Sequence, residues 1–243
     1  MTTYRDHSPP RTAIVTGASR GFGFSVAGQL AQQDWNLVVD ARTSTDLERA
    51  VAEFDALGSG EVRSLAGDIT DPAHARGLVE AAAELGSLSL LVNNAGILGP
   101  SPQPRLAAYP LDSLEEVLDV YVVAPLRLIQ LALPRLRDNA GTVINVTSDA
   151  AVEAYEGWGG YGSAKAALEQ ISKVLSVEEP DVTVYWLDPG DMRTRMHQEA
   201  FPDEDIGDRP LPETRAPAVI RLLNETPPSG RYTAEQLLEP VVR

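Results

Sequence analysis

A tyrosine and a lysine stand four residues apart in the middle of the chain, as Tyr161-Gly-Ser-Ala-Lys165, and Ser148 precedes them. On a helix, residues i and i+4 share a face, so these two side chains would project into one site. A tyrosine hydroxyl can take up or release a proton when its pKa, normally about 10, is lowered, and a nearby ammonium lowers it. The Ser148 hydroxyl could hold a substrate oxygen in place. The trio therefore predicts a hydroxyl acid-base unit.

A glycine-rich loop lies near the start of the chain, in the order Thr16, Gly17, Ala18, Ser19, Arg20, Gly21, Phe22, Gly23. Glycines are needed where backbone must turn tightly, approach a pyrophosphate and let a helix pack closely on a strand. The helix that follows would point its amino terminus at the phosphates. This segment therefore predicts a nucleotide site.

Short apolar runs alternate with helical patterns along the whole chain. The pattern predicts strands at 12–15, 37–39, 62–66, 88–92, 142–146, 182–187 and 230–233. It predicts helices at 24–33, from a Ser44 cap to Gly58, from Asp71-Pro72, at 113–137 behind a capping box (Ser113 to Glu116) with a kink at Pro125, at 159–177 and at 216–223. This alternation predicts an α/β fold, a Rossmann-like, doubly wound parallel sheet of about seven strands with helices on both faces. Ligands bind such sheets at the carboxyl ends of the strands.

The length of 243 residues suits one domain. We expect it to span residues 12–243, with 1–11 as a flexible lead-in that lacks the apolar core of a signal peptide. Residues 195–213 are acidic and proline-rich, and are predicted to form a substrate-covering loop with at most short helices.

Composition excludes several classes of function. The chain has no cysteine, and its three histidines, His7, His74 and His197, are scattered, so no metal site is predicted. The formal net charge of −15 argues against a nucleic-acid partner. No apolar run approaches about 18 residues, so no membrane association is expected. These features together predict a cytoplasmic protein.

Three further segments match one family in order. Asp68 with Ile69 follows the third strand, the run Asn93, Asn94, Ala95, Gly96 follows the fourth, and Pro189-Gly190 with Thr194 follows the sixth. With the glycine loop and the trio, they resemble the short-chain dehydrogenases/reductases over roughly residues 12 to 195. The resemblance implies that Asp68 touches the adenine, that Asn94 to Gly96 line the cofactor, and that Pro189 to Thr194 hold the nicotinamide carboxamide.

The resemblance also implies an activity, which is hydride transfer between a nicotinamide cofactor and a carbonyl or alcohol. In that family, the residue matching Tyr161 is the acid/base. The residue matching Lys165 lowers the pKa of that tyrosine and binds the nicotinamide ribose. The residue matching Ser148 orients the carbonyl.

The second strand carries the residues that would select the cofactor. A carboxylate there accepts hydrogen bonds from the ribose hydroxyls and repels a 2′-phosphate, whereas an arginine favours the phosphate. Asp40 points to NAD(H), but by comparison with the family the selecting position is Ala41. Arg42 then stands where NADP-dependent members carry a basic residue, and Arg20 adds a second cation. We therefore predict NADP(H) rather than NAD(H).

One position departs from the family pattern. Many members carry an asparagine on the long fourth helix that holds a water of a proton relay to the lysine, and Tyr121 stands there in this chain. Tyr121 either rebuilds the relay or packs in the core with its hydroxyl satisfied, and the sequence leaves both open.

Substrate and assembly are less defined. Tyr155, Trp158, Met192, Met196 and Phe201 suggest a flat or apolar carbonyl compound. The resemblance implies a homodimer or homotetramer built on the fourth and fifth helices, although the stretch from 161 to 189 is shorter than usual.

Two other functions stay open, a non-catalytic NADP(H)-binding sensor and a lyase or epimerase with a bound cofactor. The intact trio counts against the first, and the short carboxy-terminal region counts against the second.

Overall fold

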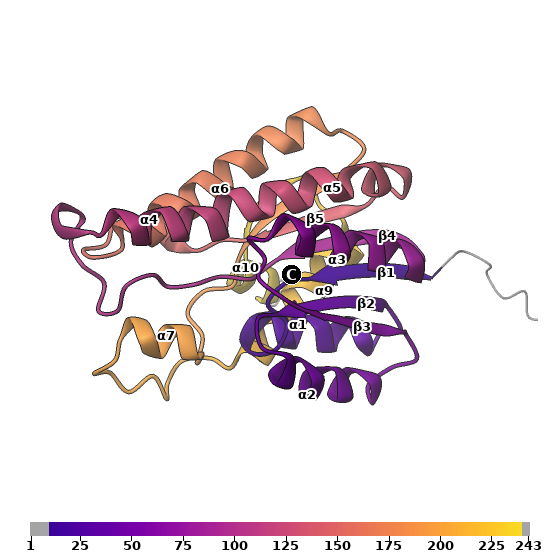
Figure 1. Cartoon of the computed structure of the whole chain (residues 1–243), viewed down its shortest axis with the longest axis horizontal. Helices are drawn as coiled ribbons and strands as arrows, with labels where there is room; N and C mark the ends of the chain where they lie inside the picture. The colour runs from indigo at the N-terminus through magenta and orange to yellow at the C-terminus, as the bar shows by residue number, and fades with distance from the viewer. Residues whose placement is uncertain (1–9, 240–243) are drawn as a thin grey trace, which may run out of the picture.

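The structure is a computed structural model, and it describes residues 10–239. Seven parallel strands form one sheet in the order β3-β2-β1-β4-β5-β6-β7 (Figure 1). The strands are β1 (Arg11–Val15), β2 (Asn36–Ala41), β3 (Val62–Ala66), β4 (Ser87–Asn93), β5 (Thr142–Val146), β6 (Thr183–Asp188) and β7 (Gly230–Thr233). The strand order reverses between β1 and β4, so the two halves of the sheet meet there and open a crevice at their carboxyl ends.

Helices cover both faces of the sheet, as the predicted doubly wound fold requires. One face packs on α1 (Gly21–Ala31), α2 (Ser44–Asp55), α9 (Pro217–Glu225) and α10 (Ala234–Leu238). The other packs on α3 (Pro72–Leu85), α5 (Ala124–Asp138) and α6 (Gly159–Glu178). Figure 1 shows α1 and α2 below the sheet and α5 and α6 above it. The central strands are apolar throughout because both of their faces are buried, and the predicted single-domain α/β fold is confirmed.

Several element ends differ from the sequence prediction. Helix α1 begins at Gly21 rather than at residue 24, inside the glycine loop. Strand β1 begins at Arg11, within the predicted lead-in, and residues 1–9 of that lead-in lie outside the described part of the chain. Thr43, not Ser44, precedes α2. Helix α10 was not predicted, and it begins at a capping box formed by Thr233 and Gln236.

The fourth helix also begins earlier than predicted. Helix α4 (Leu111–Leu118) starts behind Pro110, so Ser113 lies within its first turn and the predicted capping box is wrong. A π-helical turn, η2 (Asp119–Val123), then joins α4 to α5. The amide of Ala124 donates to the Asp119 carbonyl, which is the wider spacing of a π turn. Pro125 has no amide hydrogen to continue the α ladder, so the predicted kink takes the form of this turn.

The joined run Leu111–Asp138 is long and apolar enough, by length and composition alone, to cross a membrane. The sequence analysis predicted no such run. Leu128, Ile129 and Leu136 are fully buried in the core beside α3, and α5 contacts β4. Packing inside the domain therefore accounts for the apolar character of this helix.

The region 195–213 holds only short helices, as predicted. They are α7 (Arg195–Ala200) and α8 (Pro212–Arg215). In Figure 1, α7 stands clear of the sheet at the lower left, below α4. Two 3₁₀ turns complete the fold, η1 (Leu106–Ala108) and η3 (Asp149–Ala151), and η3 follows β5 directly.

Candidate active site

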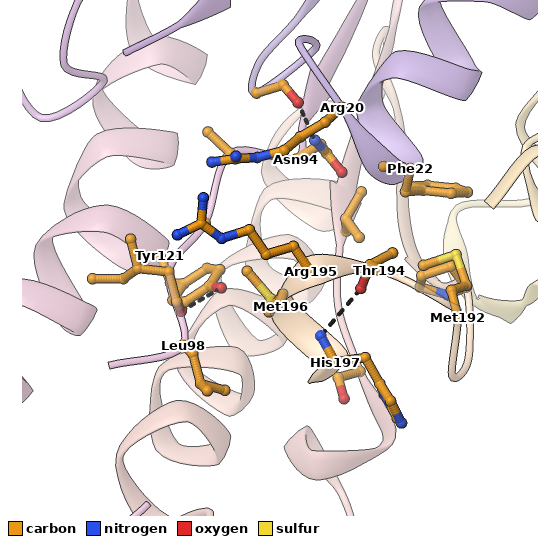
Figure 2. Close-up of a pocket in the computed structure, with 18 of the residues that line it drawn as sticks. Arg20, Phe22, Asn94, Leu98, Tyr121, Met192, Thr194, Arg195, Met196 and His197 are labelled. Atoms are coloured by element: carbon orange, nitrogen blue, oxygen red, sulfur yellow. Dashed lines mark hydrogen bonds between the residues drawn. The ribbon is translucent and has the colours of Figure 1, made fainter. Parts of the chain in front are cut away.

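A cavity of about 1190 Å³ opens at the carboxyl ends of the strands. The loops after β1, β2, β3, β4, β5 and β6 all line it, together with α6 and α7. Figure 2 shows Arg20 and Asn94 on one side of this space, Tyr121 and Leu98 on another, and Thr194 to His197 across from them. The cavity is therefore large enough for a dinucleotide and a small substrate, at the place where this kind of sheet binds ligands.

The glycine loop forms a cradle that side chains would fill. Gly17 and Gly21 have φ angles of 65° and 62°, a region that favours glycine. A Cβ on Gly17 would lie 2.8 Å from the Ala95 backbone, and one on Gly23 would lie 2.3 Å from the Asn94 amide nitrogen. The loop therefore packs directly on the segment after β4 and leaves the amino terminus of α1 facing the cavity. This arrangement fits a pyrophosphate.

Asp40 holds the glycine loop through hydrogen bonds. Its carboxylate is buried, accepts a hydrogen bond from the Gly17 amide at 2.6 Å, and lies 3.1 Å from the Nε2 atom of His74. The Asp40 backbone carbonyl also accepts from Ala18. Because both carboxylate oxygens have partners inside the protein, Asp40 is occupied as a structural support.

Two cations line the same end of the cavity. Arg20 and Arg42 are exposed, and neither forms an ion pair with another described residue. Ala41 beside them is buried. Asp68 accepts from the amide and hydroxyl of Thr70, and these bonds hold the pKa of its carboxyl below the usual value. This end therefore presents two arginines to an incoming anion.

The segment after β4 is tied to the glycine loop. Asn94 donates from its side chain to the carbonyls of Thr16 and Gly17, at 2.8 and 3.2 Å. The amides of Asn94 and Ala95 donate to the Thr16 hydroxyl. These bonds fix the two halves of the cavity floor relative to each other.

Ser148 and Tyr161 meet at the inner end of the cavity. Helix α6, which carries Tyr161, approaches η3 so closely that a Cβ on Gly162 would lie 2.6 Å from the Ala150 carbonyl oxygen. Burial raises the pKa of Tyr161 above its usual value, contrary to the lowering expected from a nearby ammonium, and the neighbouring hydroxyls of Ser148 and Tyr121 only oppose this shift. The Ser148 hydroxyl itself donates to the Asp149 carboxylate at 2.8 Å, a partner that the sequence analysis did not anticipate.

Lys165 is buried under Tyr161, as the i to i+4 spacing predicted. Its Nζ atom donates to the Val146 carbonyl at 2.7 Å. It also lies 4.0 Å from the ring centroid of Tyr121 and 5.5 Å from that of Tyr161. Burial lowers the pKa of Lys165 to about 7, and the charge of Asp188 opposes this shift.

Tyr121 comes from the π turn η2 and packs edge-on against Tyr161, with ring centroids 5.4 Å apart. Its hydroxyl donates to the Ile97 carbonyl at 2.8 Å, the contact drawn beside its label in Figure 2. A Cβ on Gly96 would lie 2.3 Å from that hydroxyl, so glycine is needed there. Of the two readings that the sequence left open, this geometry favours a packed ring with a satisfied hydroxyl.

The segment after β6 closes the cavity from the other side. Gly190 has a φ of 72°, and its amide donates to Asp188 at 2.9 Å, which fixes the turn at Pro189. Thr194 accepts from the His197 amide and begins α7, as Figure 2 shows. Trp158 lies between Tyr161 and Phe201, at ring-centroid distances of 5.5 and 5.8 Å. The substrate end of the cavity is therefore walled by aromatic rings.

Comparison with known proteins identifies the family of this chain. The sequence model of the short chain dehydrogenases matches residues 11–205. The chain belongs to the short-chain dehydrogenase/reductase family. Members are oxidoreductases that act on CH–OH or C=O groups with NAD(P), and the predicted enzyme class is confirmed.

Named relatives and solved structures agree with this assignment. A benzil reductase ((S)-benzoin forming) of Saccharomyces cerevisiae is 29% identical and covers 96% of this chain and 86% of its own length. The sepiapterin reductase of Meriones unguiculatus is 34% identical over 77% of this chain and 76% of its own. The solved alcohol dehydrogenase of the archaeon Thermococcus sibiricus, complexed with 5-hydroxy-NADP, superposes with a TM-score of 0.83 at 26% identity. That match covers 92% of this chain and 95% of the solved one.

The structure gathers the residues predicted from sequence around one cavity. Gly23 is the exception, because it lies in the first turn of α1 behind the lining. The lining includes Gly17, Ser19, Arg20, Gly21, Phe22, Ala41, Arg42, Asp68, Ile69, Asn94, Ala95, Gly96, Tyr121, Ser148, Tyr161, Lys165, Pro189, Gly190 and Thr194. Within residues 10–239, no group of three His, Asp or Glu side chains is placed to hold a metal ion.

Sequence reasoning missed two charged groups beside Ser148, Tyr161 and Lys165. Asp149 accepts from both Ser148 and the Tyr155 hydroxyl, and its place next to Ser148 was the available signal. Arg231, in the last strand, donates to Glu169 and Asp188, both at 2.9 Å. No motif marks Arg231, and only the pairing of β7 with β6 brings it to the site.

Proposed function

We propose that the chain is an NADP(H)-dependent carbonyl reductase, reversible as an alcohol dehydrogenase, in which Tyr161 is the acid/base. The observation that carries this proposal is the burial of Tyr161 and Lys165 side by side, with Ser148, at the end of a cavity whose other end carries two arginines. When bound, the nicotinamide supplies or accepts the hydride, and the protein supplies the proton and the geometry.

Two observations support NADP(H) over NAD(H). Arg20 and Arg42 offer charge-assisted hydrogen bonds to a 2′-phosphate, whereas the Asp40 carboxylate is already held by Gly17 and His74. The solved relative from Thermococcus sibiricus was obtained with an NADP derivative. Gly17, Gly21 and the amino terminus of α1 would hold the pyrophosphate of either cofactor.

The protein's part of the reaction follows from the state of the two side chains. Because burial raises the pKa of Tyr161, the phenol is protonated at neutral pH and can donate to the oxygen of a reduced carbonyl. Lys165 is positioned to stabilise the phenolate that remains, and Ser148 to hold the oxygen at hydrogen-bonding distance. In the reverse direction, the phenolate takes the proton of an alcohol.

The substrate end supports a flat or apolar carbonyl compound. Trp158, Tyr155, Met196 and Phe201 line this part of the cavity. Aromatic and thioether side chains contact planar groups favourably without demanding hydrogen bonds. Two relatives are named for the reduction of benzil and of sepiapterin, and these compounds belong in a first substrate panel.

The test of catalysis is NADPH oxidation, followed by absorbance against a panel of ketones and aldehydes. We expect turnover by the wild-type chain and a loss of at least about 10²-fold in kcat for Tyr161→Phe, with NADPH affinity retained. Tyr232→Phe is the matched control, because its hydroxyl bonds Pro228 outside the cavity. Tight NADPH binding with no turnover of any panel compound would favour a sensor instead.

The cofactor preference has a separate test. Arg42→Ala should weaken NADPH binding about tenfold and leave NADH binding unchanged, because only the 2′-phosphate contact is lost. Arg49→Ala, an exposed arginine on α2 outside the cavity, is the control. Asp40→Asn should weaken both cofactors alike by loosening the glycine loop. An NADH efficiency equal to that of NADPH in the wild-type chain would contradict the proposal.

A further inference from the structure

The last strand contributes one arginine that bonds to segments lining the cavity. Arg231 lies opposite Trp186 in the register of β7 and β6, in the edge strand of the sheet. Its side chain is only 26% exposed. It lies beyond residue 205, where the match to the family sequence ends.

The guanidinium of Arg231 reaches three separate segments. Its Nε atom donates to Glu169 Oε1 at 2.9 Å, and its second terminal nitrogen donates to Asp188 Oδ2 at 2.9 Å. The same nitrogen also donates to the Ser148 backbone carbonyl at 3.3 Å. A planar guanidinium suits such a set because its donors are fixed in direction.

Each contact ends on a segment that carries the chemistry. Ser148 belongs to the trio itself. Glu169 lies one turn after Lys165 on α6, and it also accepts from the Thr147 hydroxyl at 2.9 Å. Asp188 precedes Pro189, and its other oxygen accepts from the Gly190 amide. Arg231 therefore joins the serine, the catalytic helix and the turn that is proposed to hold the nicotinamide.

The contacts of Arg231 pair its charge with two buried carboxylates. The side chains of Glu169 and Asp188 are 2% and 8% exposed, and Arg231 is the cation within 3 Å of both. Lys173 approaches the second oxygen of Glu169 only at 3.9 Å, from the surface. Removal of Arg231 would leave two buried carboxylates without their partner, which is strongly unfavourable unless the segments move apart.

We propose that Arg231 is a positioning residue for hydride transfer, which sets the Ser148 loop, helix α6 and the Pro189-Gly190 turn in one productive arrangement. The inference rests on the proposed reductase function. Strand β7 is then a working part of the active site as well as the edge of the sheet. A displacement of about 1 Å at a reacting group can cost about 10²-fold in rate, so a junction of this kind acts on kcat without touching the substrate.

Two substitutions separate positioning from folding. Arg231→Lys keeps the charge but cannot reach all three acceptors at once, and Arg231→Gln removes the charge. Arg221→Lys and Arg221→Gln are the matched controls. Arg221 is another arginine of the carboxy-terminal region with an ion pair, to Glu225 at 2.7 Å, and it lies outside the cavity.

For the full-length variants we would measure kcat with the best panel substrate and the kinetic isotope effect with NADPH deuterated at the transferred position. We would also measure the affinities for NADPH and for 2′-phospho-ADP-ribose, which lacks the nicotinamide. We expect kcat to fall about 10²-fold for Arg231→Gln and less for Arg231→Lys, with a larger isotope effect. Affinity for 2′-phospho-ADP-ribose should stay within about twofold, while the ratio of the two affinities changes because the nicotinamide turn is released.

The outcomes are distinct. If both Arg231 variants keep the wild-type isotope effect and affinity ratio, and lose activity only with the folded fraction, Arg231 is structural and the inference is wrong. If Arg231→Gln does not fold, Arg231→Lys decides. A wild-type chain that turns over no panel compound still tests the inference through the affinity ratio. A wild-type chain that binds neither NADPH nor its fragment overturns the proposed function, and the inference with it.

Discussion

Burial acts on Tyr161 and Lys165 in the same sense, because it favours the uncharged form of each. It raises the pKa of the Tyr161 phenol and lowers the pKa of the Lys165 ammonium to about 7. The Tyr121 ring under Lys165 and the carboxylate of Asp188 work against this loss of charge. The protein thus keeps the Tyr161 phenol protonated beside a lysine whose pKa lies close to neutral pH. This combination suits the proposed reduction of a carbonyl.

The depressed pKa of Lys165 makes stability depend on pH. Between about pH 7 and 10.5 the unfolded chain binds one more proton at this residue than the folded chain does. The stability of the wild-type protein, relative to Lys165→Met, should therefore rise with pH in this window, by at most about 1.4 kcal/mol per pH unit. Urea unfolding of both proteins at a series of pH values checks this. A difference that is flat across the window, or that falls, would contradict the lowered pKa.

Tyr121 contributes a ring and a hydroxyl that can be tested apart. Tyr121→Phe removes the bond to Ile97 and the hydroxyl that opposes the raised pKa of Tyr161, so we expect kcat to fall about three- to tenfold. Tyr121→Leu also removes the ring under Lys165, and its loss should be larger, with a shifted pH profile. Steady-state kinetics across pH separates the two. Tyr121→Phe as inactive as Tyr161→Phe would mean that the Tyr121 hydroxyl carries protons after all.

Residues with a local signature were predictable, and residues that depend on distant contacts were not. The Tyr161–Lys165 pair follows from helical spacing, and the glycine loop from its need for positive φ angles. Asp40 was set aside as a cofactor-selecting residue only by comparison with the family, and its bond to Gly17 gives it a structural role. Arg231 carries no local signal, because its role arises from the pairing of β7 with β6.

At the level of elements, the type of each strand and main helix followed from periodicity, whereas several boundaries did not. The serine at 113 has the spacing of a cap, but Pro110 already fixes the chain for a helix that starts at Leu111. The π turn η2 could not be predicted as such. Pro125 marked an interruption of the helix, but the wider π spacing is made by the amide of Ala124, which bonds to the Asp119 carbonyl.

Close contact between α6 and η3 gives an element-scale prediction. Gly162→Ala would set a Cβ 2.6 Å from the Ala150 carbonyl oxygen, so α6 must move away from Ser148. We expect a loss of about 1–3 kcal/mol in stability and a fall in kcat. Gly28→Ala, in α1, is the matched control. Its Cβ would lie 3.6 Å from Leu57, an ordinary contact, so helix propensity should stabilise this variant by about 0.5–1 kcal/mol.

Denaturant unfolding measures both glycine variants under the same conditions. Opposite signs are expected for the same substitution in two helices, since the added Cβ would meet backbone at Ala150 but make only ordinary contacts beside Gly28. A stabilising Gly162→Ala would show that α6 can shift without cost, and would remove the basis for close positioning of Tyr161 and Ser148.

At the scale of the whole molecule, the charge distribution separates the cofactor end from the rest of the surface. The chain carries a formal charge of −15, yet the end of the cavity proposed for the 2′-phosphate presents Arg20 and Arg42. An acidic surface keeps proteins apart and soluble, and a local pair of arginines supplies the attraction that an anionic cofactor needs. The overall charge therefore argues only against a class of partner, nucleic acid. The prediction of NADP(H) instead rests on the positions of Arg20 and Arg42.

Assembly is the remaining property of the whole molecule. Helix α6 exposes two apolar side chains, Val174 and Val177, at 43% and 82%. We expect a homodimer or homotetramer that covers this helix, so Val177→Asp should shift the protein toward monomer in size-exclusion chromatography with light scattering. Leu57→Asp, a 42% exposed apolar residue at the end of α2, is the control. A buried carboxylate without a partner cannot be accommodated at the centre of an interface, so an assembly unaffected by Val177→Asp would contradict this interface. A monomeric wild-type protein would contradict it as well.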